Sequence, residues 1–439
     1  LVPEALDRVR ELFAPAGFNV VPGGRDRAGK LPAVKALEPG SAVAVDVLRG
    51  DLNLSAIGTV TYVDGDRVLL FGHPFFQSGA IRLPLSTARI TTILGSLNTS
   101  FKLGVPGVPV GTATQDRRAA VAGRLGPPPT LMPIALRVEG GAPRAQTFRF
   151  EAIDDRALLP QLLSTAVLNS MMESGGTSGV QTVEWSLTVW SDGRALTLAD
   201  RAAGESPMAD VAGAITAPIR FLTSNPYSRF RPDSLTMAIS MLPGRRQSTV
   251  RNARLLEPVV RPGGVARVEV QVEPWRGSRQ TLTLTLPVPE DLPDGRYPLQ
   301  VAGGLEADRQ SALRLPNRFR PVSLEDAWQR LATSRRSDTM NLILWGNAPE
   351  LNLDGQDMPE LPGSAVAVLA PSQQGGDLAR RSDWAIVQDV RQSMSMVLRG
   401  EVMLELVVDR VALRLTPDKL PVVEHRSPVD EGALSPFGA

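Results

Sequence analysis

Cysteine is absent from the 439-residue sequence, which excludes disulfide bonds and thiolate metal sites. A chain without cysteine is typical of bacterial proteins of the periplasm or the secreted fraction, although it is also compatible with the cytosol. No apolar run reaches the ~18 residues that a membrane-spanning helix needs. No His, Asp and Glu residues have the spacing of a metal site. We therefore expect no cofactor, no metal and no transmembrane segment.

An excess of charge of one sign is also lacking, since 47 Lys and Arg residues balance 46 Asp and Glu residues. This balance predicts no strong electrostatic partner, so neither nucleic acid nor an anionic membrane is favoured. Apolar residues make up 43% of the chain, enough for each of about two to four domains to bury a core.

A β-hairpin is the clearest local pattern. Residues 59–63 and 67–71 are rich in β-branched and apolar side chains, and Asp-Gly-Asp at 64–66 joins them. His73 follows in a Phe-Gly-His-Pro run, where Pro74 restricts it to extended backbone angles and Gly72 leaves space beside it. An imidazole held at a strand end suits a general base, and the alternative is a histidine of the core or of a turn.

The second histidine, His425, lies in a proline-rich tail and is expected at the surface. Among acids, Asp64 and Asp66 are seven or more residues from His73 along a strand, about 20 Å away, and cannot orient its ring. The expected register instead puts residues 56–58 opposite His73 and Ser55 just beyond. Ser55 is then a possible neighbour or a simple strand residue.

The region from residue 40 to residue 153 resembles the SpoIVB family of serine peptidases. The run Gly-Thr-Val-Thr-Tyr-Val-Asp at 58–64, followed by Phe-Gly-His-Pro at 71–74, is similar to the family segment that contains the catalytic histidine. Met-Pro-Ile-Ala at 132–135 fits a later strand. A third family segment is matched by Gly111, Asp116, Gly123 and Leu125. The resemblance implies that His73 is the general base and that Asp116 is the best candidate for its acid partner, with Asp51 next.

One part of the family pattern is missing, because the nucleophile motif Gly-Met-Ser-Gly-Ser-Pro does not occur. The nearest string, at residues 175–180, offers Ser178 as a candidate nucleophile. In some relatives the motif precedes the histidine segment. The start at Leu1, without Met or a signal-peptide pattern, is consistent with a serine on a separate or cleaved N-terminal piece. The expected partners are then that fragment or another envelope protein, in a complex or a homo-oligomer.

The strand patterns and the resemblance together predict a mainly β protein. We expect a trypsin-like or SpoIVB-like β-barrel domain with peripheral helices at 1–204 and a helical connector at 205–232. An immunoglobulin-like β-sandwich at 233–315, a mixed, mostly β region at 316–415 and a proline-rich tail at 416–439 follow.

Two functions compete at this point. The first is an exported serine peptidase that uses His73 and a serine from outside this chain. The second is a catalytically inactive binding or structural protein of the bacterial envelope, in which the barrel and the sandwich serve as interaction surfaces.

Overall fold

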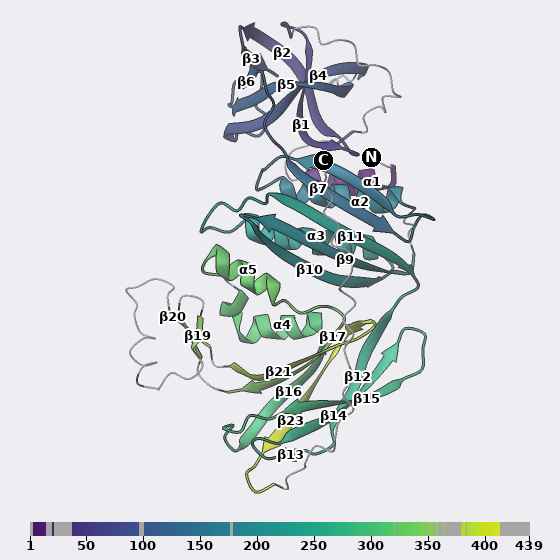
Figure 1. Ribbon diagram of the computed structural model, residues 1–439, viewed down its shortest axis with the longest axis vertical. Helices are drawn as coiled ribbons and strands as arrows, with labels where there is room; N and C mark the ends of the chain where they lie inside the picture. Colours follow the sequence, from purple (N-terminus) through teal and green to yellow (C-terminus); the bar gives the residue numbers. More distant parts are fainter. Residues whose placement is uncertain are drawn as a thin grey trace.

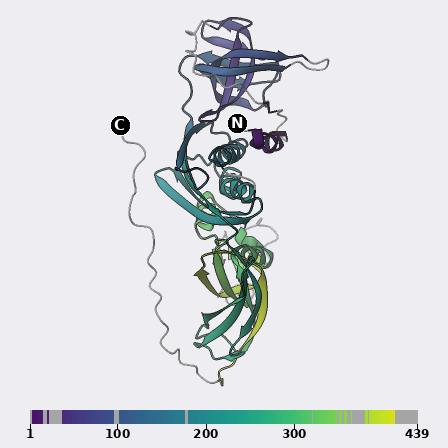
Figure 2. The same cartoon turned by 90° about the vertical axis from the view of Figure 1, so that its right-hand side faces the viewer.

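The protein is mainly β, as predicted, and consists of three parts stacked along one long axis in the computed structural model (Figures 1 and 2). The structure describes residues 3–14, 20–21, 37–95, 101–175, 179–319, 321–347, 350–353, 356–358, 364, 379–382 and 384–412. A barrel lies at one end, a sheet covered by helices in the middle, and a β-sandwich at the other end.

The barrel is formed by six strands in the order β1-β2-β3-β6-β5-β4. Pairing of residues 43–45 of β1 with residues 85–87 of β4 closes it. Alternating apolar side chains fill the interior, for example Val43 and Val45 of β1. The predicted hairpin is confirmed as β2 and β3. The strands are β1 (Ala42–Gly50), β2 (Leu54–Asp64), β3 (Arg67–Leu70), β4 (Gly79–Leu94), β5 (Phe101–Asp116) and β6 (Val121–Leu125).

The middle part continues the same sheet through the pairing of β1 with β8. Its strands lie in the order β8-β7-β11-β9-β10, and the helices pack on one face, as Figure 2 shows. Helix α2 is almost wholly buried between this sheet and its neighbours. The elements are α1 (Pro3–Phe13), β7 (Met132–Glu139), β8 (Gln146–Ala152), α2 (Leu159–Glu173), β9 (Gln181–Ser191), β10 (Arg194–Gly204), α3 (Pro207–Thr223) and β11 (Ser234–Pro243).

Two expected boundaries differ from the structure here. Residues 205–232 were expected to form a connector, yet α3 packs against α2 and buries Val211, Ile215 and Ile219 in the core of the middle part. Residue 233 was expected to begin the sandwich, yet β11 pairs with β7 and β9 inside the large sheet. Alternation along β11 indicates a half-buried strand but not the sheet that it joins.

The sandwich has two sheets around one core. One contains β12 (Gln247–Leu255), β14 (Val265–Pro274), β15 (Gln280–Pro287) and β22 (Val397–Arg399). The other contains β13 (Val259–Val260), β16 (Gly295–Gly303), β17 (Thr339–Gly346), β21 (Ala385–Ser393) and β23 (Glu401–Val408). Because β22 pairs with β12 and β23 pairs with β16, the expected separate regions 233–315 and 316–415 build one sandwich together.

Shorter elements complete the described chain. Helices α4 (Gly304–Arg314), η2 (Pro316–Phe319) and α5 (Leu324–Ala332) lie between the sandwich and the middle part (Figure 1). A small sheet contains β18 (Glu350–Leu353), β19 (Gln356–Met358) and β20 (Ala379–Ser382). Among the helices of the described residues, none has the length and hydropathy to cross a bilayer. The tail at 416–439, with His425, lies outside the described residues.

Candidate active site

The loop at residues 71–78 carries His73 out of the barrel where β3 ends. Phe71, Gly72 and Gln77 have φ angles of 69°, 72° and 57°, so the chain turns through left-handed conformations. Such angles cost about 1–3 kcal/mol at a residue with a side chain and cluster at functional sites. Because β3 ends at Leu70, His73 is not opposite residues 56–58 as the register predicted.

His73 is exposed, and its ring orientation is set by two contacts. Its Nδ1 lies 2.8 Å from the carbonyl oxygen of Pro74. Since a carbonyl can only accept, Nδ1 carries the proton in the neutral ring, and in that form Nε2 presents a lone pair. The ring also stacks on Phe71, with centroids 5.7 Å apart and planes 15° apart. The tautomer and the exposure are those that a general base needs.

Asp116 anchors this loop rather than the ring. The Asp116 side chain is buried, and its carboxylate accepts hydrogen bonds from the backbone N–H groups of Phe75, Phe76 and Ser78 at 2.8, 2.5 and 3.2 Å. The expected hydrogen bond from a carboxylate to His73 is therefore not found within the described part of the chain. Asp116 acts through the backbone, as a positioning residue.

Gly58 explains why the run before the hairpin needs a glycine. A Cβ at this position would overlap the ring of Phe71, which lies across β2 at that point. The backbone N–H of Phe71 also donates to the carbonyl oxygen of Thr59 at 2.9 Å. The glycine thus allows the aromatic ring on which His73 stacks to lie flat against the barrel.

Ser55 is committed elsewhere. Its hydroxyl donates to Asp46 Oδ1 at 2.6 Å, Ser86 donates to Asp46 Oδ2 at 2.5 Å, and Arg49 Nε lies 3.7 Å from the same carboxylate. Asp46 is 1% exposed, so this is a buried polar cluster that holds β1, β2 and β4 together. Sequence reasoning missed it, although an acid in the alternating apolar run of β1 was a signal.

The other acids near the barrel are structural. Asp51 accepts a hydrogen bond from the backbone N–H of Arg149 at 2.7 Å and supports the pairing of β1 with β8. Asp66 pairs with Arg124 at 2.6 Å on the barrel surface.

Ser178 lies outside the described residues. The described chain before it ends at Gly175, and the hydroxyl of the preceding Ser174 donates to Gln146 Oε1 at 2.9 Å. Gln146 begins β8, whereas the barrel contacts β8 at residues 150–152, the opposite end of that strand.

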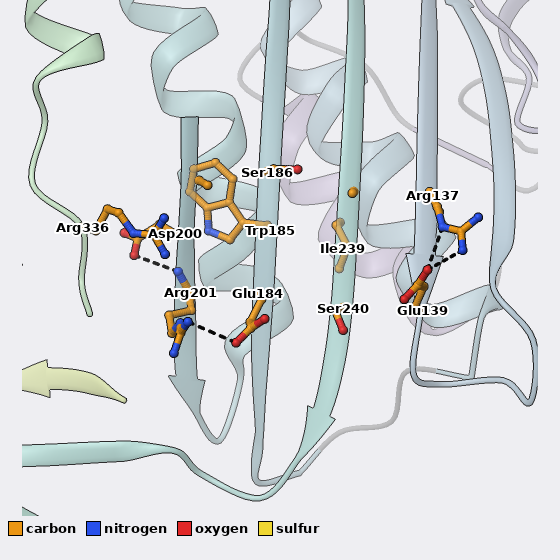
Figure 3. A pocket seen from close by; sticks show the side chains of 12 residues that line it. Arg137, Glu139, Glu184, Trp185, Ser186, Asp200, Arg201, Ile239, Ser240 and Arg336 are labelled. Atoms are coloured by element: carbon orange, nitrogen blue, oxygen red, sulfur yellow. Dashed lines mark hydrogen bonds and ion pairs between the residues drawn. The ribbon is translucent and has the colours of Figure 1, made fainter. Parts of the chain in front are cut away.

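A second candidate site is a depression of about 290 Å³ on the open face of the middle sheet (Figure 3). Its charged groups are all paired. Arg137 contacts Glu139, Arg201 contacts Glu184, and Arg336 contacts Asp338. Burial raises the pKa of Asp200, which accepts hydrogen bonds from the hydroxyl and the backbone N–H of Ser337. These contacts join the middle part to the sandwich and leave no group poised for catalysis.

Across the described ranges, no three His, Asp or Glu side chains form a group that holds a metal ion. Comparisons of the chain with protein-family models, with curated proteins and with solved structures found no match. The candidate active site is therefore defined by the geometry of the His73 loop alone.

Proposed function

We propose that this chain is the base-carrying part of an exported serine peptidase of the SpoIVB type. The observation that carries the proposal is His73 itself, exposed with its Nε2 lone pair available, in a strained loop that a buried carboxylate clamps. Within the described residues His73 has no hydrogen bond to a serine hydroxyl. Our proposal is that the nucleophilic serine lies on a separate or cleaved N-terminal piece or on another envelope protein; the candidate of this chain, Ser178, lies outside the described residues.

The chemistry follows from the tautomer. A serine hydroxyl placed within about 3 Å of Nε2 gives up its proton to the ring as its oxygen attacks a peptide carbonyl. The imidazolium then donates that proton to the leaving amine, and a water molecule resolves the acyl-enzyme by the same route. The carbonyl of Pro74 holds the ring through Nδ1, where a carboxylate holds it in other serine peptidases.

The test is labelling of the native protein, expressed in its own host, with a fluorophosphonate probe. Loss of a general base slows such reactions by about 10²- to 10⁴-fold, so the His73→Ala variant is expected to lose labelling by that factor. The His425→Ala variant, which removes the second histidine of the chain, is the matched control and is expected to label as the parent does.

The binding protein is the competing function, favoured by the absence of a serine beside His73 in the described part of the chain. It predicts no labelling of the parent protein, or labelling that the His73→Ala substitution leaves unchanged. Either result overturns the peptidase proposal.

A further inference from the structure

The barrel has a local excess of positive charge that the balanced composition of the whole chain conceals. Between residues 67 and 125 the sequence has seven basic residues, of which Arg124 pairs with Asp66 of the preceding turn, and one acid, Asp116. That acid is buried and occupied by the His73 loop. The basic residues are Arg67, Arg82, Arg89, Lys102, Arg117, Arg118 and Arg124. The excess that matters for the His73 loop comes from Arg82, Arg117 and Arg118, because Arg124 is paired with Asp66 and Arg67 adjoins that acid.

Three of these arginines lie where the loop meets β4. Gly79 pairs with Asp116 in the ladder between β4 and β5, and Arg117 Nη1 lies 3.8 Å from where a Cβ of Gly79 would be. Arg82 is three residues further along β4, about 10 Å away at the rise of a strand. All three arginines are exposed, and none has an acidic partner in the part of the chain that the structure describes. The guanidinium of Arg117 donates to Gln115 Oε1 at 2.9 Å, and Arg118 adjoins Arg117 in the sequence.

The backbone beside these arginines is an unpaired strand edge. Strand β4 pairs with β5, with breaks in register that include one between Ala80 and Leu83, and it pairs with β1 only at residues 85–87. Gly79 and Ala80 thus have β5 on one side, Ile81 and Arg82 lie in the register break, and among the described residues no strand pairs with these four on the other side. Ala80 and Arg82 are exposed and Ile81 is half-buried, so this edge is accessible. An exposed edge of this kind is a template for another strand.

We propose that residues 79–82 bind an extended, acidic polypeptide segment as an added strand, with Arg82, Arg117 and Arg118 pairing its carboxylates. The proposal rests on the proposed function, because it names the substrate class of the same site. Backbone hydrogen bonds supply general affinity for an extended chain, and side-chain contacts at alternate positions supply selectivity. Arginine pairs with carboxylates through two parallel hydrogen bonds, which favours Glu and Asp in the bound segment.

Polypeptide fits this edge better than nucleic acid or lipid does. The recognition groups are a row of backbone N–H and C=O groups, which only another backbone matches in register. Nucleic-acid binding needs a wider stripe of basic residues along the phosphates, and here three arginines gather at one strand end.

The experiment measures binding without turnover, using the full chain with His73→Ala and a fluorescent peptide that alternates valine and glutamate. We expect saturable binding that weakens with salt. The Arg82→Glu and Arg117→Glu substitutions together are expected to weaken it by about tenfold or more, since like charges then face each other. Arg144→Glu is the matched control. Arg144 is exposed in the turn between β7 and β8 and has no ion pair with another described residue, and its reversal is expected to change the affinity less than about twofold.

The place of binding needs a separate test. Because the chain has no cysteine, a single introduced cysteine can carry a crosslinker at one chosen position. A thiol-reactive photocrosslinker on an Ala80→Cys variant is expected to capture the peptide, and the same reagent on Ala145→Cys, in the distant turn, is not. Equal capture at both sites, equal binding of a valine–lysine peptide, or binding to phosphatidylglycerol vesicles in place of the peptide overturns the proposal. Peptide binding without fluorophosphonate labelling of the native protein would refute the peptidase function alone, and labelling without peptide binding would refute the acidic-strand site alone.

Discussion

Asp116 links the sequence to the geometry of the His73 loop at the scale of a single residue. Its carboxylate is the acceptor for three backbone N–H groups of that loop. A hydrogen bond to a charged group is worth about 1.5–3 kcal/mol, and a buried donor left without a partner carries a penalty of its own. The side chain therefore holds a strained turn in place.

We predict that Asp116→Ala lowers the free energy of unfolding by about 3 kcal/mol or more, measured by urea denaturation. The His73-dependent labelling rate is expected to fall as well, and Asp116→Asn, which keeps one acceptor oxygen, to recover part of it. Asp66→Ala is the control, because it removes only an exposed ion pair with Arg124 and should cost less than about 1 kcal/mol. Unchanged labelling in a folded Asp116→Ala variant would contradict the positioning role.

How far the sequence predicts the site also differs from residue to residue. His73 could be placed at the end of a hairpin because Asp-Gly turns and Gly-His-Pro runs have local backbone preferences. The role of Asp116 could not, since it depends on a ladder between β4 and β5 that brings residues 40 positions apart into contact. The pairing of Ser55 with Asp46 is equally non-local, nine residues apart across two strands.

At the scale of elements, strand β2 and the His73 loop are fitted to each other through Gly58. A methyl group there meets the Phe71 ring, which cannot move without releasing the stack on His73. The absence of a side chain at this one position of β2 is what permits the loop to fold back against the barrel.

We predict that Gly58→Ala destabilises the protein by about 1–3 kcal/mol, as overpacking does. It is also expected to reduce His73-dependent labelling by more than an equally destabilising substitution at a remote site does. Thermal unfolding and the labelling rate are the two measurements. Gly65→Ala in the hairpin turn is a poor control because its φ is positive, so Gly213→Ala in α3, where a Cβ meets no neighbour, is the matched variant. Labelling that follows stability equally in both variants would count against the fit between Gly58 and the loop.

Prediction of elements from the sequence succeeded where the signal was local and failed where it was topological. The hairpin at β2 and β3 follows from its β-rich runs and the Asp-Gly turn between them. Alternation in β11 is the same whichever sheet it joins, so the boundary at residue 233 was misplaced. The late strands β22 and β23 pair with β12 and β16, which lie more than 90 residues earlier in the sequence, and no short-range pattern indicates such pairing.

At the scale of the whole molecule, the middle part and the sandwich meet at a set of charged groups around Asp200 (Figure 3). Arg201 bridges to Asp338 at 3.1 Å, and Ser337 donates to Asp200. Burial raises the pKa of Asp200, so the folded state favours its protonated form more than the unfolded state does. That contribution to stability is complete below pH 3.8 and is lost as the pH rises through the raised value.

We predict that Asp200→Asn, which keeps an acceptor oxygen and removes the charge, gains stability relative to the parent as the pH rises from 3.8 through the raised pKa of Asp200 in the folded state. Urea unfolding at several pH values measures the difference. A difference that stays constant with pH, or that grows in favour of the parent, would mean that Asp200 is ionised in the folded state at no cost.

The central claim is that the Nε2 of His73 is the base of a serine peptidase, and chemical rescue tests it most directly. In the native protein with His73→Ala, the substitution leaves the loop without its ring, and added imidazole can occupy that space. The account predicts that imidazole restores fluorophosphonate labelling of the His73→Ala variant in a concentration-dependent manner and does not affect the parent. Labelling of the variant that equals the parent's without imidazole, or the absence of labelling from the parent itself, would contradict the account.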